Sequence, residues 1–295
     1  MQPRNFWRQQ AHSSHFEITP SPTDYNERTD FFGNRVAYFS VQKPHTKLLV
    51  TVVSEVSLFP KHNSLDLFNA VTWEQVQQIM QGNVLINSQS QSFDNQSQSQ
   101  SQSQTQNQSS EYMLELFDAR QYVLDSPMVS VSAELAEYAR ASFLPQRALV
   151  EVVHDLMARI YKDFTYDPTF TTIATPLSDV LQFRRGVCQD FAHLAIGCLR
   201  AYGIAARYVS GYVETLPEPG KTRLVGADAS HAWFSVYIPA IGWMDFDPTN
   251  NKVPHDQHIT LAWGRDFSDV TPLKGIAFGG GQHTLSVSVD VLRLA

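Results

Sequence analysis

The stretch RRGVCQDFAHLA at residues 184–195 constrains the fold of this chain more than any other part of the sequence. A Gly-Val turn leads into Cys188, and after it apolar residues recur at three- and four-residue steps from Ala192 to Tyr202, as on the face of a buried helix. Gly203 then ends the run in the manner of a glycine at a helix C-terminus. The pattern therefore predicts a helix whose first turn carries Cys188.

A cysteine at the start of a helix has a chemical use. Unpaired amide N–H groups and the helix dipole favour an anion there, and the thiolate is the nucleophilic form of cysteine. The backbone N–H groups of Val187 and Cys188 are also candidate donors to a developing oxyanion. The alternative is a small apolar residue that packs in the helix, as most lone cysteines do. This stretch alone leaves both interpretations open.

Composition excludes several classes of protein. The chain has 295 residues, 43% of them hydrophobic, and a net charge of −7 without a lysine- or arginine-rich block, so nucleic acid is not an expected partner. No stretch reaches the ~18 apolar residues of a membrane span, and the first 20 residues lack the apolar core of a signal peptide. We therefore expect a cytoplasmic protein that does not bind membranes; composition leaves its oligomeric state open.

The chain has two cysteines, Cys188 and Cys198. Ten residues along one helix separate them by about 15 Å, whereas a disulfide needs Cα atoms within ~7 Å. They are therefore expected not to pair, and two cysteines so arranged do not make a zinc site. The apolar neighbours of Cys198 predict that it belongs to the core.

The first half of the chain predicts a small β region. Residues 1–30 are polar and rich in turn formers, whereas 35–41 and 47–56 are β-branched and aromatic and predict two antiparallel strands. Residues 72–80 predict a short helix capped by the threonine at its start. The serine- and glutamine-rich tract at 88–110 cannot bury enough surface to offset its ordering entropy, so we expect it to be disordered.

The second half predicts helices first and strands afterwards, which indicates an α+β fold. Residues 175–179, ahead of the cysteine helix, are expected to form a loop and a short turn. Expected helices cover 133–143 and 147–164, and expected strands cover 205–213, 231–238, 243–247 and 284–292.

A cysteine nucleophile needs a base and a group that orients the base, and histidine is the usual base. His231 opens a strand after a polar loop, where site residues collect. Asp247 ends the next strand, and an adjacent antiparallel strand can bring its carboxylate beside His231. Asp245 lies on the same face by the period of two and is the rival.

The other candidates are less favourable. His193 lies about 140° around the helix from Cys188, at roughly 100° per residue, and faces elsewhere. Asp190 is also turned away and suits the helix dipole as a first-turn acid. His255 and His258 remain possible bases on a later loop.

Three motifs in this order closely resemble the bacterial transglutaminase-like family: GVCQDFA at 186–192, HAW at 231–233 and GWMDFDPTN at 242–250. GRDFSDV at 264–270, with GGGQH at 279–283, is similar to the C-terminal segment of that family. Residues 31–56 resemble its N-terminal β region. The resemblance is strong from residue 122 to the end. The chain is expected to begin late, without the first strands of that region, and the serine- and glutamine-rich tract departs from the family pattern.

The resemblance implies a papain-like α+β core with a Cys-His-Asp triad. Cys188 is then the nucleophile, His231 the base and acid, and Asp247 the orienting group, because the aspartate of the family precedes Pro-Thr. The expected division is an N-terminal β-rich region of the bacterial transglutaminase type at 1–120 and a transglutaminase-like catalytic domain at 121–295.

The expected function is acyl transfer from a peptide or carboxamide to a cysteine, through a thioester. Hydrolysis, as in a peptidase or amidase, is preferred because water is always present. The alternatives are a protein-glutamine transglutaminase, with an amine as acceptor, and a non-catalytic binding module on the same fold. The expected partner is a peptide or protein substrate. No cofactor is expected, and no metal, because no acidic loop has calcium spacing.

Further candidates have weaker support. Gln182 and the Val187 N–H group are candidate oxyanion donors, and Trp233 and Trp243 are candidate residues of the acyl pocket, although strand aromatics are more often core. Arg265 and Asp266 are interpreted either as a structural ion pair or as substrate contacts.

Overall fold

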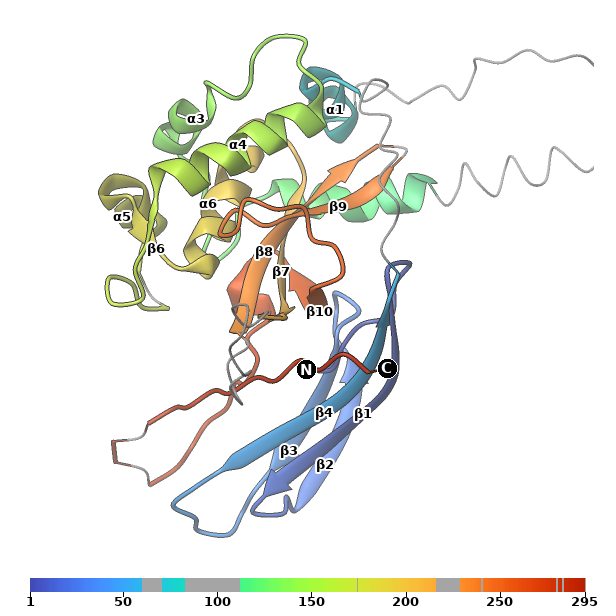
Figure 1. The fold of residues 1–295 in the computed structure, drawn as a ribbon, viewed down its shortest axis with the longest axis vertical. Coiled ribbons are helices and arrows are strands. Elements are labelled where there is room, and N and C mark those ends of the chain that lie inside the picture. The colour runs from blue at the N-terminus through green and yellow to red at the C-terminus, as the bar shows by residue number, and fades with distance from the viewer. Residues whose placement is uncertain are drawn as a thin grey trace, which may run out of the picture. The chain divides into compact units, whose positions relative to one another are not determined.

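A computed structural model of the chain provides the coordinates (Figure 1). It describes residues 1–59, 71–82, 112–173, 175–215, 229–239, 241–279, 281–282 and 284–294. The tract at 88–110 that was expected to be disordered lies outside the described residues.

Contacts within the chain group it into two compact units that alternate along the sequence. One, here called the β-rich unit, contains Met1–Ser64, Tyr208–Trp233 and Val253–Ala295. The other, here called the helical unit, contains Leu65–Arg207 and Phe234–Lys252. The boundary expected near residue 120 stays a prediction.

The N-terminal part of the β-rich unit consists of two antiparallel strand pairs (Figure 1). Strand β1 (Gln9–Thr19) pairs with β4 (Leu49–Leu58), and β2 (Asp24–Thr29) pairs with β3 (Arg35–Ser40). The prediction was wrong in two respects: residues 1–30 contain two strands, and the two expected strands pair with these rather than with each other. The strands were missed because they are polar and mostly solvent-exposed, so they lack the alternation of apolar residues that marks a half-buried strand.

A four-stranded sheet has the order β10-β7-β8-β9. Strands β7 (Ala206–Val213), β8 (Ala229–Ile238) and β9 (Gly242–Phe246) confirm three expected strands. Strand β10 (His258–Gly264) was not predicted, and its first residue, His258, was expected on a loop. The strand expected at 284–292 was wrong. Its residues form no named strand, and two of the side chains expected on its buried face, Leu285 and Val287, are 71% and 67% exposed.

Side-chain amides cover the outer edge of β10. The Gln9 side chain donates to the Thr260 carbonyl and accepts from the Thr260 N–H, both at 2.8 Å. Asn34 does the same with Trp263, at 2.9 and 3.0 Å. Each amide thus satisfies one donor and one acceptor of an edge strand, which protects that edge from pairing with another chain. The N-terminal segment is held on β10 by these contacts.

The helical unit contains the predicted helices, each shorter than expected. Thr72 caps the first helix through a capping box with Gln75. The segment at 175–179 was predicted to be a loop and a short turn, but most of it belongs to helix α5. The helices are α1 (Trp73–Met80), a helical segment at 112–120, the 3₁₀ turn η2 (Gln121–Val123), α3 (Ala133–Ala139), α4 (Leu149–Asp163), α5 (Leu177–Phe183) and α6 (Cys188–Ala201). None of the helices that the structure describes is both long and apolar enough to cross a membrane.

Helix α6 is the centre of the helical unit. It contacts α3, α4 and α5, and all of its residues from Asp190 to Arg200 are buried. Gly203 follows it with a φ of +70°, a left-handed conformation that glycine adopts without strain, as expected for a residue just past a helix. The expected cysteine helix is therefore confirmed at both of its ends.

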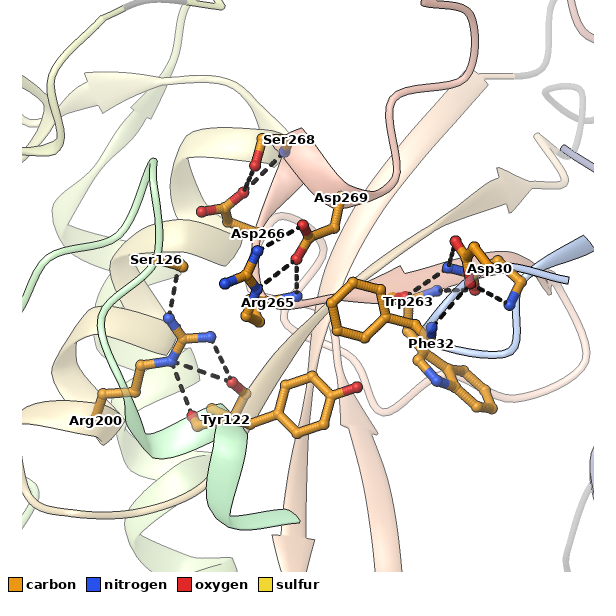
Figure 2. A network of polar contacts seen from close by, with 12 residues as sticks. Asp30, Phe32, Tyr122, Ser126, Arg200, Trp263, Arg265, Asp266, Ser268 and Asp269 are labelled. Carbon is orange, nitrogen blue, oxygen red and sulfur yellow. Dashed lines mark hydrogen bonds and ion pairs between the residues drawn. The ribbon is translucent and has the colours of Figure 1, made fainter. Parts of the chain in front are cut away.

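Arg200 is a buried charge near the end of α6 (Figure 2). Its Nε donates to the Tyr122 carbonyl at 2.9 Å, its Nη2 to the Ala206 carbonyl at 3.0 Å, and its Nη1 to the Ser126 hydroxyl at 3.0 Å. Two of these acceptors are backbone carbonyl groups, of Tyr122 and Ala206. The guanidinium therefore fixes the segment at 122–126 and the start of β7 against α6.

We predict that Arg200→Met lowers the free energy of unfolding by about 3 kcal/mol, because buried carbonyl groups lose a charged donor. Urea denaturation followed by circular dichroism measures this. The matched control is Arg140→Met, which removes an arginine with a side chain that is 71% exposed and paired with Glu137 at the surface. Its effect should stay within about 0.5 kcal/mol. Equal effects of the two substitutions would contradict the structural role of Arg200.

Candidate active site

The turn that delivers Cys188 is held by a short parallel strand pair. β5 (Thr165–Tyr166) pairs with β6 (Arg185–Gly186), and hydrogen bonds continue on both sides of the pair. Arg184 ends α5 in the left-handed conformation, with φ +57° and ψ +37°. Its guanidinium lies over the rings of Tyr138 and Phe164, at 4.6 and 4.8 Å from their centroids. The left-handed conformation of Arg184 turns the chain between α5 and α6, and the ring contacts hold its side chain in place.

Asp190 closes the N-terminus of α6. Its Oδ2 accepts from the Val187 N–H at 2.8 Å, and the Thr171 side chain also hydrogen-bonds to it. Burial raises the pKa of Asp190, and these two hydrogen bonds partly oppose that rise. Gly186 is required beside it, because a Cβ there would lie 2.8 Å from the Asp190 Cβ. The first-turn acid expected at this position is confirmed, and it caps the helix through the Val187 N–H.

Cys188 is the first residue of α6, half-buried and not in a disulfide. Its backbone N–H belongs to the first turn, where the helix offers no acceptor. The Val187 N–H, the other candidate oxyanion donor, is already engaged by Asp190, so a donor role would require it to exchange partners. Tyr166 lies nearby: burial raises its pKa, and electrostatic interactions with Cys188 and Asp190 add to that rise.

Cys198 is a core residue, as predicted. It is fully buried, and its thiol donates to the Leu135 carbonyl at 3.6 Å. Burial raises the pKa of Cys198 to about 12. This thiol is therefore not a nucleophile at neutral pH in the folded chain.

Asp247 follows the last residue of β9 and is fully buried. Its carboxylate accepts from the Asn250 side-chain amide at 2.7 Å and from the Thr249 and Asn250 backbone N–H groups at 3.0 and 3.2 Å. These hydrogen bonds fix the position of the carboxylate. Asp245, its rival, lies within β9 opposite Ser235.

His231 belongs to the β-rich unit and is only 9% exposed. Its ring centroid lies 6.1 Å from that of Trp233 and 6.2 Å from that of His258. Trp233 in turn meets His258 edge-on, with ring centroids 5.2 Å apart at 89°. Trp233 crosses β7 at Gly211, where a Cβ would lie 2.5 Å from the indole. His231, Trp233 and His258 are called here the imidazole–indole cluster.

His258 was expected on a loop, but it opens β10 and is only 7% exposed. The run from His258 to Trp263 contains two β-branched residues and an aromatic residue, a strand signal that was available in the sequence. His255 does lie on an exposed loop, beside Asp256.

The weaker candidates have separate locations. Gln182 is exposed on α5 and lines a cavity of about 1170 Å³ together with Asp190 and His193. Cys188 is not among the described residues that line this cavity. This agrees with the expectation that His193 and Asp190 face away from Cys188. The oxyanion role of Gln182 stays a prediction.

Trp233 is fully buried, and Trp243 packs on Tyr122 and Tyr237. Both fit the core interpretation, and a role in an acyl pocket stays a prediction for each. Arg265 forms an ion pair with Asp269 through two hydrogen bonds, at 2.9 and 3.0 Å (Figure 2). Asp266 caps the 3₁₀ turn η3 (Phe267–Asp269) through Ser268.

Of the three residues expected to form a triad, Cys188 begins α6, His231 lies in β8, and Asp247 directly follows β9. Cys188 and Asp247 belong to the helical unit and His231 to the β-rich unit. Their mutual arrangement stays a prediction, as does the absence of a metal or cofactor.

Two family profiles match the chain. The Transglutaminase-like superfamily matches residues 136–248, which include Cys188, His231 and Asp247, and the Bacterial transglutaminase-like N-terminal region matches residues 1–57. The chain belongs to the transglutaminase-like superfamily. The match to 1–57 includes β1 and β2, and the expectation that the chain begins late stays a prediction.

Two of the relatives described here align with nearly the whole chain, and a third aligns with part of it. An uncharacterised protein of Mycobacterium tuberculosis is 38% identical over 98% of this chain and 84% of its own length. An uncharacterised protein of Mycobacterium leprae is 30% identical over 99% of this chain and 90% of its own length. A protein-glutamine gamma-glutamyltransferase of Pseudomonas aeruginosa is 32% identical over 42% of this chain and 20% of its own length.

A solved structure supports the transglutaminase-like, papain-like α+β fold that was predicted. It is a candidate cysteine protease from Cytophaga hutchinsonii, with a TM-score of 0.60 and 21% identity, covering 92% of this chain and 76% of that one. At this identity the likeness concerns the fold.

The cap at α6 leads to a prediction on Asp190. Asp190→Ala should lower the free energy of unfolding by about 1–2 kcal/mol, because the Val187 N–H loses its acceptor. Asp190→Asn keeps an acceptor oxygen and should retain most of that stability. Urea denaturation measures both.

The pH dependence of stability distinguishes the hydrogen bond that Asp190 accepts from the Val187 N–H from the cost of burying its charged carboxylate. Because burial raises the pKa of Asp190, stability falls as pH rises from the ordinary aspartate pKa through the raised one. Asp190→Asn removes that loss, so its stability relative to the unsubstituted chain should improve from acidic to neutral pH. An Asn variant as unstable as the Ala variant at every pH would contradict the capping role.

Proposed function

We propose that the chain is an acyl-transfer enzyme that uses Cys188 as nucleophile, His231 as base and acid, and Asp247 as the group that orients His231. The substrate is a peptide or carboxamide, and the preferred reaction is hydrolysis. The observation that carries the proposal is the N-terminus of α6, where a half-buried cysteine is the first residue of the helix. The turn before it is held by the capping Asp190 and by the close packing of Gly186 against that residue.

The register of β8 and β9 supports Asp247 over Asp245. Phe234 pairs with Phe246 and Ser235 with Asp245. The pairing ends at Phe234 and Phe246, and Asp247 is the next residue after β9. Asp245 pairs with Ser235, which lies four residues, or about 13 Å, along β8 from His231. The hydrogen bonds that fix the carboxylate of Asp247 suit a group that orients an imidazole.

The proposed reaction has two steps. In the first, the Cys188 thiolate attacks the carbonyl carbon, and the tetrahedral oxyanion accepts a hydrogen bond from the Cys188 N–H at the helix N-terminus. The C–N bond breaks as His231 gives its proton to the departing amine, and a thioester remains. In the second, His231 takes a proton from water, the resulting hydroxide attacks the thioester, and the carboxylic acid leaves as Cys188 is regenerated.

Transamidation is the second candidate. It differs only in that an amine replaces water in the second step, and the name of the Pseudomonas aeruginosa relative favours it. The aligned part covers only 42% of this chain, so hydrolysis stays the preferred proposal.

The first test is the pH dependence of alkylation by iodoacetamide, with the labelled peptide identified by mass spectrometry. We predict fast labelling of Cys188 near pH ~6, well below the ~8.5 of a free thiol, because the thiolate is paired with an imidazolium. Cys198 should stay unlabelled in the folded chain, because burial raises its pKa to about 12.

His231→Ala should abolish the fast labelling at acidic pH. His255→Ala is the matched control, because it removes an exposed loop histidine, and it should leave the profile unchanged. Labelling that rises only near pH ~8.5, and equally in the unsubstituted chain, His231→Ala and His255→Ala, would contradict the catalytic proposal and favour a binding module.

The acceptor is tested with a glutamine-containing peptide, with and without an added primary amine, analysed by mass spectrometry. Hydrolysis should convert glutamine to glutamate or cleave the peptide whether or not the amine is present. An amine adduct as the main product would establish transamidation instead. Cys188→Ala should give neither product.

A further inference from the structure

The imidazole–indole cluster contains a second histidine beside the proposed base. One ring nitrogen of His231 and one of His258 lie within 4.8 Å of each other, and both side chains are buried. The two residues come from strands that are separated by β7 in the sheet, and Trp233 spans β7 between them over Gly211. The reaction proposed above uses only one of the two imidazoles. The second therefore needs its own explanation.

Neutral imidazole is a preferred ligand of zinc and of other late first-row divalent cations. Two imidazoles on one tetrahedral zinc ion, with Zn–N bonds of about 2.0–2.1 Å, have ligand nitrogens about 3.4 Å apart. The present separation is within 4.8 Å, so a small rotation of either ring closes the difference. Trp233 packs against both rings, which restricts how far they can turn apart.

We propose that His231 and His258 form an inhibitory site for a zinc ion. The inference rests on the proposed function, because the ion would occupy the imidazole that this function uses as base. Zinc takes the lone pair of His231, so this imidazole can no longer accept a proton. No oxidation or covalent step is involved, and a protonated imidazole releases its proton as the ion binds. Catalysis stops while the ion is bound and resumes when it is removed.

Zinc binding is measured first without reference to activity, by calorimetric titration of the full chain with zinc chloride in a buffer that does not chelate. We expect one site per chain, weakened at least ~10-fold in His258→Gln. His255→Ala is the matched control, three residues away on the exposed loop, and should bind as the unsubstituted chain does. Equal affinity in His258→Gln, or no site in the unsubstituted chain, overturns the proposal.

A second measurement avoids dependence on the folding of a variant. Histidines of the unsubstituted chain are modified with diethylpyrocarbonate, with and without zinc, and the modified positions are found by mass spectrometry. Zinc should slow modification of His231 and His258 and leave His255 unaffected. Bound zinc that protects neither His231 nor His258 overturns the proposal.

Activity separates this inference from the proposed function. Turnover of the glutamine peptide should fall in proportion to zinc occupancy and return on addition of EDTA. Zinc binding at these histidines in a chain that shows no catalysis would leave the metal site standing and remove the proposed enzyme. A catalyst whose turnover is unaffected at full zinc occupancy would remove the inhibitory role and leave the enzyme.

Discussion

The hydrogen bond from the Val187 N–H to the Asp190 carboxylate is the interaction on which the cysteine turn depends. It satisfies a backbone donor at the start of α6 that the helix itself cannot satisfy. It also draws the carboxylate against Gly186, where any side chain would collide. The position of Cys188 follows from these two neighbours, because the residue lies between the bonded N–H and the capping acid. A glycine, a cysteine and an aspartate at fixed spacing thus act as one structural unit.

The sequence predicts the parts of the fold that depend on local patterning. The start of α6 and its end at Gly203, the capping box at Thr72 and the burial of Cys198 all rest on neighbours within a few residues. Each involves an interaction whose partners lie within one or two turns of the chain, so the periodicity and the terminal residues are sufficient to predict it. For the same reason Cys188 could be placed at the start of the helix and Cys198 in its core.

The features that the sequence did not predict depend on distant partners. Strand β1 is polar, and its pairing with β4, some 40 residues away, is what makes it a strand. The segment from 284 to 292 alternates as a strand should, yet Leu285 and Val287 remain exposed, because an alternating sequence does not ensure that another element covers its apolar face. His258 was placed on a loop because its neighbour β7 lies 45 residues earlier in the chain. Its proximity to His231 could not be predicted without the order of the strands.

The separation of the two cysteines on α6 has a consequence for oxidative damage. A sulfenic acid formed on an exposed thiol is commonly relieved by a second cysteine that condenses with it to a disulfide. Cys198 cannot serve in this way for Cys188, because it lies ten residues along the same helix and its thiol is buried and protonated. Oxidised Cys188 therefore has no resolving partner within its own chain and depends on an external thiol for recovery. Without one, further oxidation to the irreversible sulfinic form is the expected fate of this cysteine under peroxide.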